Sequence, residues 1–123
     1  MHRTPHTVSD VMTHTVVAVG PHTGFKEIVG TMERWHVSAL PVLAGDGRVV
    51  GVVSERDLLP KEAGAATAEE LMSAPALTVR EDATLAQVAR TLALMSLKRL
   101  PVVDRSGRLQ GIVSRCDLRR RHR

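Results

Sequence analysis

The chain has 123 residues, of which 43% are hydrophobic, 24% charged and 2% aromatic, and it contains one cysteine. This composition is typical of a globular protein with an aliphatic core. A single cysteine excludes an internal disulfide, which suits a reducing compartment. No apolar run approaches the roughly 20 residues of a membrane-spanning helix. We therefore expect a cytoplasmic protein with no membrane association.

The formal net charge of +4 lies at the C-terminal end of the sequence. Four arginines occupy the last five residues, and taking them from the 17 Lys and Arg leaves 13, which equals the number of Asp and Glu. We expect a neutral body with a solvated basic tail. Nucleic-acid binding is not expected, because no aromatic stacking residues accompany the tail.

A shift of 60 residues aligns the chain with itself without a gap. It places Met12 on Met72, Leu40-Pro41-Val42 on Leu100-Pro101-Val102, Gly51 on Gly111, Ser54 on Ser114 and Asp57 on Asp117. A fixed period of this kind indicates an internal duplication. It predicts two repeats, residues 1–60 and 61–123, that pack about a pseudo-two-fold axis as one module.

Each repeat predicts the same order of elements: strand, helix, strand, strand, helix. A helical turn at residues 8–12 precedes an apolar strand at 15–19, and the counterparts are 68–72 and 76–79. An amphipathic helix follows, marked by apolar residues at i, i+3, i+4 and i+7: Phe25, Ile28, Val29 and Met32, then Leu85, Val88, Ala89 and Leu92. Thr84 with Gln87 fits a capping box, and Gly24 with Glu27 is the same device with a weaker cap.

A β-hairpin follows each predicted helix. "ALPVLAGDGRVVGVV" turns at Asp46-Gly47, and "RLPVVDRSGRLQGIV" turns at Ser106-Gly107. The helix between the first and second strands allows a crossover connection, and the hairpin makes the last two strands antiparallel. The predicted fold class is therefore α/β (α+β), with two β-α-β-β-α repeats. "PKEAGAA", at residues 60–66, is predicted to be a short linker.

Both hairpins end in Ser-x-x-Asp, at Ser54 to Asp57 and at Ser114 to Asp117. The spacing fits a helix-capping box, worth about 1 kcal/mol. It also fits half of a small-molecule site, because a carboxylate accepts two hydrogen bonds from a diol. A glycine precedes each serine by three residues inside the strand, which is typical of close approach by a ligand or another backbone.

The chain resembles a tandem pair of cystathionine-β-synthase-type domains, the CBS pair or Bateman module. The motifs are "TVSDVMT" and "TAEELMS" at the openings, "HVSALPVL" and "LKRLPVVD" at the second strand, and "GRVVGVVSERDLL" and "GRLQGIVSRCDLR" at the close. The resemblance implies a non-catalytic regulatory module, often a disc-like homodimer, that acts on an effector protein or an attached effector domain. It also implies binding of an adenosine-containing ligand, with AMP, ADP, ATP and S-adenosylmethionine left open.

The resemblance further implies two clefts, each uniting the Ser-x-x-Asp of one repeat with the opening and second-strand segments of the other. One cleft is expected to contain Ser54, Arg56, Asp57, Thr67, Met72, Leu97 and Lys98. The other is expected to contain Ser114, Cys116, Asp117, Thr7, Asp10, Met12, Val37 and Ser38. The Asp is expected to bind ribose hydroxyls and the Ser to meet phosphate.

The two expected clefts differ in charge. Arg56 and Lys98 give the first cleft two cations that can make charge-assisted bonds to phosphate. We expect the first cleft to prefer a phosphorylated adenosine ligand. The second cleft, with Ser38 and Cys116, is expected to take a less anionic ligand or to stay empty.

Other functions fit the residues less well. No nucleophile with a neighbouring base and no catalytic carboxylate pair recurs, so an enzyme is not predicted. His2 and His6 are four apart, but no Cys or acidic ligand follows at a metal-site spacing, so no metal site is predicted. The alternative to ligand sensing is a dimerisation or protein-interaction module with vestigial clefts. The two cleft methionines, with Val37 and Leu97, are also expected to pack in the core.

Overall fold

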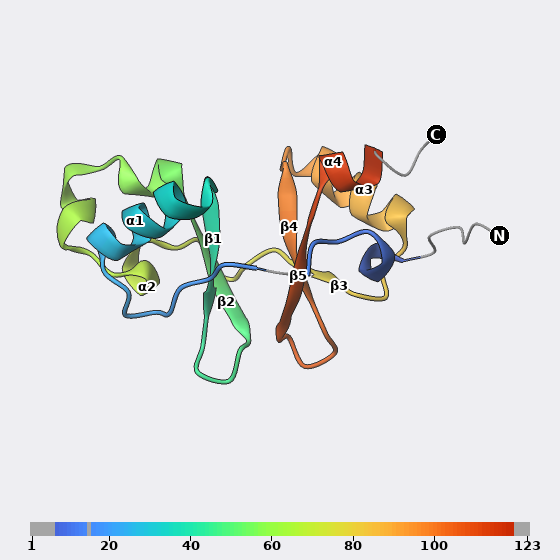
Figure 1. The fold of residues 1–123 in the computed structure, drawn as a ribbon, viewed down its shortest axis with the longest axis horizontal. Coiled ribbons are helices and arrows are strands. Elements are labelled where there is room, and N and C mark those ends of the chain that lie inside the picture. The colour runs from blue at the N-terminus through green and yellow to red at the C-terminus, as the bar shows by residue number, and fades with distance from the viewer. Residues whose placement is uncertain (1–6, 15, 120–123) are drawn as a thin grey trace. The chain divides into compact units, whose positions relative to one another are not determined.

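The computed structural model describes residues 7–14 and 16–119, and the chain divides into two compact units. The central unit comprises residues 17–77, and the flanking unit combines residues 1–16 with 78–123. In Figure 1, helices cover one face of the hairpin in each unit. The predicted division at residue 60 concerns the repeats and stays a prediction.

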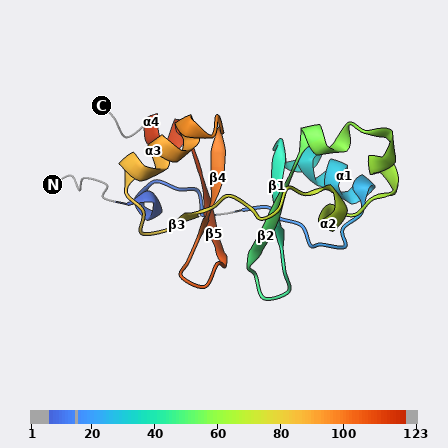
Figure 2. The same ribbon diagram turned by 180° about the vertical axis from the view of Figure 1, so that it is seen from behind.

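The central unit is built on one antiparallel hairpin. Its elements are α1 (Phe25–Trp35), β1 (Ala39–Leu43), β2 (Val49–Ser54), the 3₁₀ helices η2 (Glu55–Leu58) and η3 (Lys61–Ala65), and α2 (Ala68–Leu71). Figure 2 shows α1 and α2 on the same side of the hairpin. Ile28 of α1, Leu40 and Val53 of the strands, and Ala68 of α2 are all fully buried in one cluster.

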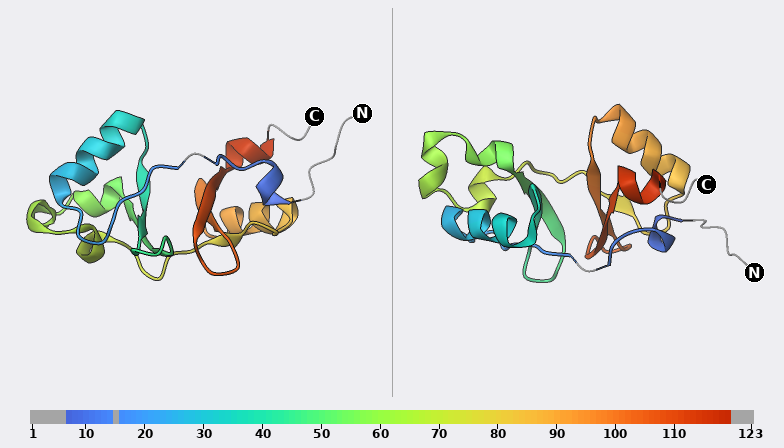
Figure 3. Two further views of the ribbon diagram at one scale, coloured as in Figure 1. Left: turned by 60° about the horizontal axis from the view of Figure 1, so that its bottom comes forward. Right: turned by 45° about the horizontal axis from the view of Figure 1, so that its top comes forward.

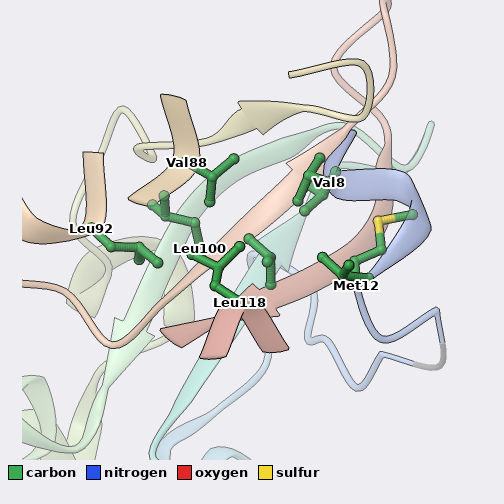
Figure 4. Close-up of a cluster of buried hydrophobic side chains, with 9 residues drawn as sticks. Val8, Met12, Val88, Leu92, Leu100 and Leu118 are labelled. Carbon is green, nitrogen blue, oxygen red and sulfur yellow. The ribbon is translucent and has the colours of Figure 1, made fainter. Parts of the chain in front are cut away.

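The flanking unit contains a three-stranded sheet in the order β3-β4-β5. Its elements are η1 (Val8–Asp10), β3 (Val79–Arg80), α3 (Leu85–Leu94), β4 (Arg99–Val103), β5 (Leu109–Ser114) and α4 (Arg115–Arg119). β3 is parallel to β4, and β4 is antiparallel to β5. Figure 4 shows the core cluster, in which Val8 and Met12 meet Val88, Leu100 and Leu118.

The segment that opens the first repeat packs on the body of the second. The Val8 N–H donates to the Ala83 carbonyl at 2.9 Å, and Thr13 and Ile112 exchange two backbone hydrogen bonds of 2.9 and 3.0 Å. Figure 3 shows the chain that follows η1, in blue, passing beside β5. We call residues 7–13 the first opening segment, and it belongs to the flanking unit.

The converse holds in the central unit. The Ala68 N–H donates to the Thr23 carbonyl at 2.8 Å, and Val52 and Ser73 exchange hydrogen bonds of 3.2 and 2.9 Å. We call residues 67–73 the second opening segment. The repeats have thus exchanged their opening segments, which explains why the compact units differ from the repeats.

Most of the predicted elements are confirmed. The two amphipathic helices are α1 and α3, and the hairpins turn with Gly47 and Gly107 at φ 90°, a conformation that favours glycine. The capping box at the start of α3 is present, since the Thr84 hydroxyl accepts from the Gln87 N–H at 3.1 Å and the Gln87 side chain bonds the Thr84 N–H at 2.9 Å.

Three predictions are wrong. Over residues 16–19 the predicted strand reduces to one bridge from Val19 to Val42, because the chain turns immediately at residues 20–23; residue 15 lies outside the described residues. The predicted linker at residues 60–66 instead contains the 3₁₀ helix η3, which packs against α1 and buries Ala63 to 1% exposure. Gly24 makes no side-chain cap for α1, since glycine has no side-chain acceptor.

Candidate ligand-binding sites

The Ser-x-x-Asp of the central unit lies where β2 ends and η2 begins, and we call it the central turn. The Ser54 N–H donates to Oδ2 of Asp57 at 2.7 Å, and the Ser54 hydroxyl donates to the same oxygen at 3.1 Å. The Ser38 carbonyl accepts from the Glu55 N–H at 2.9 Å. No donor among the described residues reaches Oδ1 of Asp57. The turn therefore presents a carboxylate that is bonded to Ser54 through one oxygen and open at the other.

The equivalent flanking turn joins β5 to α4. The Ser114 N–H donates to Oδ2 of Asp117 at 2.8 Å, and the Ser114 hydroxyl accepts from the Asp117 N–H at 3.2 Å. The Lys98 carbonyl accepts from the Arg115 N–H at 3.0 Å. Asp117 is 8% exposed, whereas Asp57 is half-buried. The capping-box prediction is confirmed at both turns.

Charged side chains distinguish the two turns. The Arg56 side chain is exposed and has no hydrogen-bond or ion-pair partner among the described residues. Its equivalent in the flanking turn is Cys116, an exposed free thiol. The Arg115 guanidinium donates to the Leu97 carbonyl at 2.9 Å and to the Leu92 carbonyl at 3.4 Å. The described part of the central turn thus offers an open cation, while the cation that begins α4 is bound to protein.

Arg115 was not among the predicted site residues. Its equivalent under the 60-residue shift is Glu55, so the repeat alignment contains a charge reversal directly after each serine. That reversal was the available signal. The carbonyls that accept from Arg115 could not be predicted from the sequence, because every residue has a backbone carbonyl.

The strand glycines meet methionine side chains. A Cβ built at Gly51 lies 2.7 Å from Cγ of Met72, and one at Gly111 lies 2.8 Å from Sδ of Met12 and 2.6 Å from the Thr13 carbonyl oxygen. The close approach predicted at these glycines is therefore made by the opening segments. Packing of both methionines is confirmed, and Met12 is 7% exposed.

The threonines of the opening segments cap their own helical turns. The Thr7 N–H donates to Oδ2 of Asp10 at 3.2 Å, and the Thr67 N–H and hydroxyl donate to Oε1 of Glu70 at 3.0 and 3.1 Å. The hydrogen bonds from the Thr67 backbone and hydroxyl lower the pKa of the Glu70 carboxyl below its ordinary value. Asp10 and Thr67 thus have a structural role in their own segments.

The family model of the CBS domain matches the chain twice, at residues 8–64 and 68–122. The chain belongs to the CBS domain family. The mixed α+β fold of the two CBS repeats is also that of solved CBS-pair structures, including CBSX2 from Arabidopsis thaliana. That structure is 32% identical, with a TM-score of 0.85, over 95% of this chain and 94% of CBSX2.

Two of the similar structures contain a nucleotide. CBSX2 in complex with AMP is 34% identical, with a TM-score of 0.86, over 94% of this chain and 95% of that one. The cytosolic domain of the Mg²⁺ channel MgtE in complex with ATP is 31% identical, with a TM-score of 0.85, over 94% of this chain and 48% of that one.

Among curated relatives, inosine-5'-monophosphate dehydrogenase of Methanocaldococcus jannaschii is 26% identical over 114 residues. The match covers 93% of this chain but 23% of the dehydrogenase. The chain thus spans under a quarter of the length of the first curated relatives that it matches.

The compact units distribute the predicted site residues of the CBS pair as follows. The central unit holds Ser54, Arg56, Asp57, Thr67 and Met72 of the first expected cleft, with Val37 and Ser38 of the second. The flanking unit holds Ser114, Cys116, Asp117, Thr7, Asp10 and Met12 of the second, with Leu97 and Lys98 of the first. Packing of Val37 and Leu97 against the cores is confirmed. The expected meetings between residues of different units stay predictions.

The described residues contain neither a metal-binding cluster nor a membrane-spanning helix. No group of three or more His, Cys, Asp or Glu side chains within residues 7–14 and 16–119 is placed to hold a metal ion. None of the helices in that part of the chain is long and apolar enough to cross a membrane. His2, His6 and the arginines of the tail after Arg119 lie outside the described residues.

Proposed function

We propose that this CBS pair is a non-catalytic regulatory module that binds an adenosine-containing ligand through its Ser-x-x-Asp turns. The ligand class comprises AMP, ADP, ATP and S-adenosylmethionine. The observation that carries the proposal is the Asp57 carboxylate, which Ser54 holds through Oδ2 while Oδ1 stays open. An open carboxylate oxygen accepts a ribose hydroxyl as a charge-assisted hydrogen bond. The AMP complex of CBSX2 and the ATP complex of MgtE support this ligand class.

The central turn is the one that we expect to take a phosphorylated ligand. Arg56 is exposed there without a partner among the described residues, and a guanidinium binds phosphate oxygens in a bidentate manner. Lys98 remains the second cation that we propose for this ligand. The flanking turn has Cys116 in place of Arg56, so its ligand is expected to be less anionic.

A homodimer and a separate effector are the partners that we propose for the module. A specific observation also favours the second candidate function, an interaction module with vestigial ligand sites. Trp35 is 53% exposed, and Leu94 and Met95 are 75% and 55% exposed, all at the C-terminal ends of α1 and α3. Contiguous exposed apolar side chains often mark an interaction site, and Leu94 and Met95 are neighbours in the chain.

Thermal unfolding with a ligand panel tests the two candidates. A ligand at about 100-fold excess over its dissociation constant adds about 2.7 kcal/mol of stability, which raises Tm by about 10 °C in a chain of this length. AMP, ADP, ATP and S-adenosylmethionine are compared on the wild type, with calorimetry for any that shifts Tm. An interaction module with vestigial sites predicts no shift with any of the four.

Matched variants assign the binding to a turn. Asp57→Asn and Asp117→Asn remove the carboxylate from equivalent positions of the two turns. Arg56→Ala and Cys116→Ala truncate the side chains at the equivalent positions that differ in charge. We expect Asp57→Asn and Arg56→Ala to weaken ATP binding about tenfold or more, as a lost charge-assisted bond does. Cys116→Ala is the control and leaves ATP affinity unchanged. Equal ATP affinity in the wild type, Asp57→Asn and Arg56→Ala contradicts the assignment.

Lys98→Ala tests the second cation. If Lys98 contacts the phosphate groups, its loss weakens ATP binding more than binding of adenosine, which has no phosphate. Unchanged ATP affinity in Lys98→Ala removes Lys98 from the proposed site and leaves Arg56 as its cation.

A further inference from the structure

The two Ser-x-x-Asp turns are anchored by different numbers of contacts. In the flanking turn, Arg115 makes three hydrogen bonds outside the capping box: its N–H to the Lys98 carbonyl, and its guanidinium to the Leu97 and Leu92 carbonyls. The Leu92 carbonyl belongs to the last turn of α3, and Leu97 follows that helix. The Leu92 carbonyl already accepts from the Leu97 N–H at 2.9 Å, so the guanidinium adds a second, longer bond there, and its positive charge is favourable beside the negative end of the helix dipole.

The central turn lacks this anchor. Glu55 occupies the position of Arg115, and its N–H reaches the Ser38 carbonyl at 2.9 Å. A carboxylate has no donor for carbonyl oxygens, so Glu55 cannot bind the end of α1 as Arg115 binds the end of α3.

Packing follows the same difference. In the flanking unit the turn continues as the α-helix α4, which packs against α3, and Asp117 and Leu118 are 8% and 7% exposed. In the central unit it continues as the 3₁₀ helix η2, where Asp57 and Leu58 are only half-buried. Of the two aspartates that we propose as ribose ligands, Asp117 is therefore held more firmly by its surroundings than Asp57.

We infer that Arg115 is a positioning residue: it holds the flanking turn in its binding conformation before a ligand arrives, whereas the central turn, with Glu55, becomes ordered when its ligand binds. The inference rests on the proposed ligand function of both turns. It assigns them different tasks. The flanking turn binds with little ordering cost, and the central turn couples nucleotide binding to a local change in order, which is one route from binding to a regulatory response.

Hydrogen exchange of the intact 123-residue chain without ligand tests the positioning. We expect the Asp117 amide to exchange about tenfold or more slowly than the Asp57 amide, since the extra hydrogen bonds of Arg115 must open with the turn. Arg115→Ala brings the Asp117 rate to that of Asp57, and Arg115→Lys, which keeps a donor and the charge, gives an intermediate rate. Equal rates in the wild type, or an Asp117 rate unchanged in Arg115→Ala, overturn the inference.

Binding measurements test the ligand part on each turn separately. With Asp57→Asn in the background, Arg115→Ala is expected to weaken adenosine-ligand binding at the flanking turn about three- to tenfold, and Arg115→Lys to restore part of it. With Asp117→Asn in the background, Glu55→Arg is expected to strengthen ATP binding at the central turn. In the wild type, saturating ATP is expected to slow Asp57 exchange much more than Asp117 exchange.

A purely structural role for Arg115 has a different signature. It lowers Tm in Arg115→Ala but leaves both the ligand affinity and the difference between the Asp57 and Asp117 amides unchanged, and that result overturns the inference. If no adenosine ligand binds the wild type, the proposed function fails and the ligand part fails with it. The exchange rates of the ligand-free protein still decide whether Arg115 positions the turn.

Discussion

Replacing Gly51 by alanine tests the exchange of opening segments in the intact chain. Gly51 belongs to the first repeat, and the Cβ that alanine adds would lie 2.7 Å from Cγ and 3.0 Å from Cβ of Met72, which belongs to the second. Contacts this short require movement. Overpacking of this kind costs about 1–3 kcal/mol, offset by up to about 1 kcal/mol because alanine restricts the unfolded chain more than glycine does.

Truncation of Met72 completes a double-mutant cycle with Gly51→Ala. Met72→Ala alone is destabilising, by less than the 2–5 kcal/mol typical of a fully buried methionine because Met72 is half-buried. It also removes the Cγ and Sδ atoms that meet the new Cβ. The double variant Gly51→Ala/Met72→Ala is therefore expected to be about 1 kcal/mol more stable than the sum of the single effects.

The equivalent glycine is the control. A Cβ at Gly111 meets the Thr13 carbonyl oxygen at 2.6 Å, as well as Met12. That carbonyl is backbone and accepts a hydrogen bond from the Ile112 N–H at 3.0 Å, so it cannot move aside cheaply. Gly111→Ala is expected to be the more destabilising variant, and Met12→Ala to relieve little of its cost.

Equilibrium urea unfolding of the four single and two double variants measures these free energies. A chain of this length shifts Tm by about 3–5 °C per kcal/mol, so thermal unfolding gives an independent check. The reasoning is refuted if Gly51→Ala and Met72→Ala are strictly additive, because the two residues are then not in contact. It is also refuted if Met12→Ala rescues Gly111→Ala fully.

Two further predictions concern folding units and pH. By NMR, a fragment of residues 17–77 is expected to be folded and a fragment of residues 1–60 to be unfolded. The shorter fragment lacks the second opening segment, whose four backbone hydrogen bonds to the rest of the central unit contribute about 2–6 kcal/mol, comparable to the whole stability of such a unit. A folded 1–60 fragment contradicts this. Hydrogen bonds from the Ser106 hydroxyl and the Arg108 N–H lower the pKa of Asp104. A lowered pKa stabilises the fold above the unfolded value of about 3.9, so the stability advantage of the wild type over Asp104→Asn is expected to shrink as pH falls below about 4. NMR titration checks the cause, since Ser106→Ala should raise the pKa of Asp104, and an unchanged value contradicts it.

Local patterns were sufficient to predict the helices and hairpins. The 3.6-residue spacing around Ile28 and Val88 is an average over a whole face, and a glycine at a turn has a direct conformational cause. The exchange of opening segments has no such local signal. The two segments carry the same pattern and fit either repeat, so the choice between them depends on chain connectivity and is absent from the pattern itself.

For the candidate site, too, local patterns predicted the backbone motif but not the contacts around it. The spacing of Ser54 and Asp57 specifies a capping box, and the structure contains it. Gly51 indicated a close approach, but a missing side chain gives no information about what fills the space, and Met72 fills it. The resemblance to CBS pairs supplied the residues that we propose around the ligand. It named Cys116 because that residue is equivalent to Arg56, and it left out Arg115, which acts on backbone carbonyls.

The net charge of the whole chain conceals a difference in net charge between the two units, and this difference affects ligand binding. The central unit has five Lys and Arg against eight Asp and Glu, a net charge of −3, and the flanking unit has twelve against five, a net charge of +7. Removing the four arginines of the last five residues leaves +3, so the neutral body predicted from the totals is a cancellation between units. A nucleotide at Asp57 would therefore bind in an acidic unit. Because salt screens charges beyond about 8 Å, the adjacent Arg56 governs its affinity at physiological ionic strength. In low salt the acidic unit opposes the phosphate groups at longer range, so affinity at the central turn should depend less steeply on salt than affinity for an anion at the flanking turn.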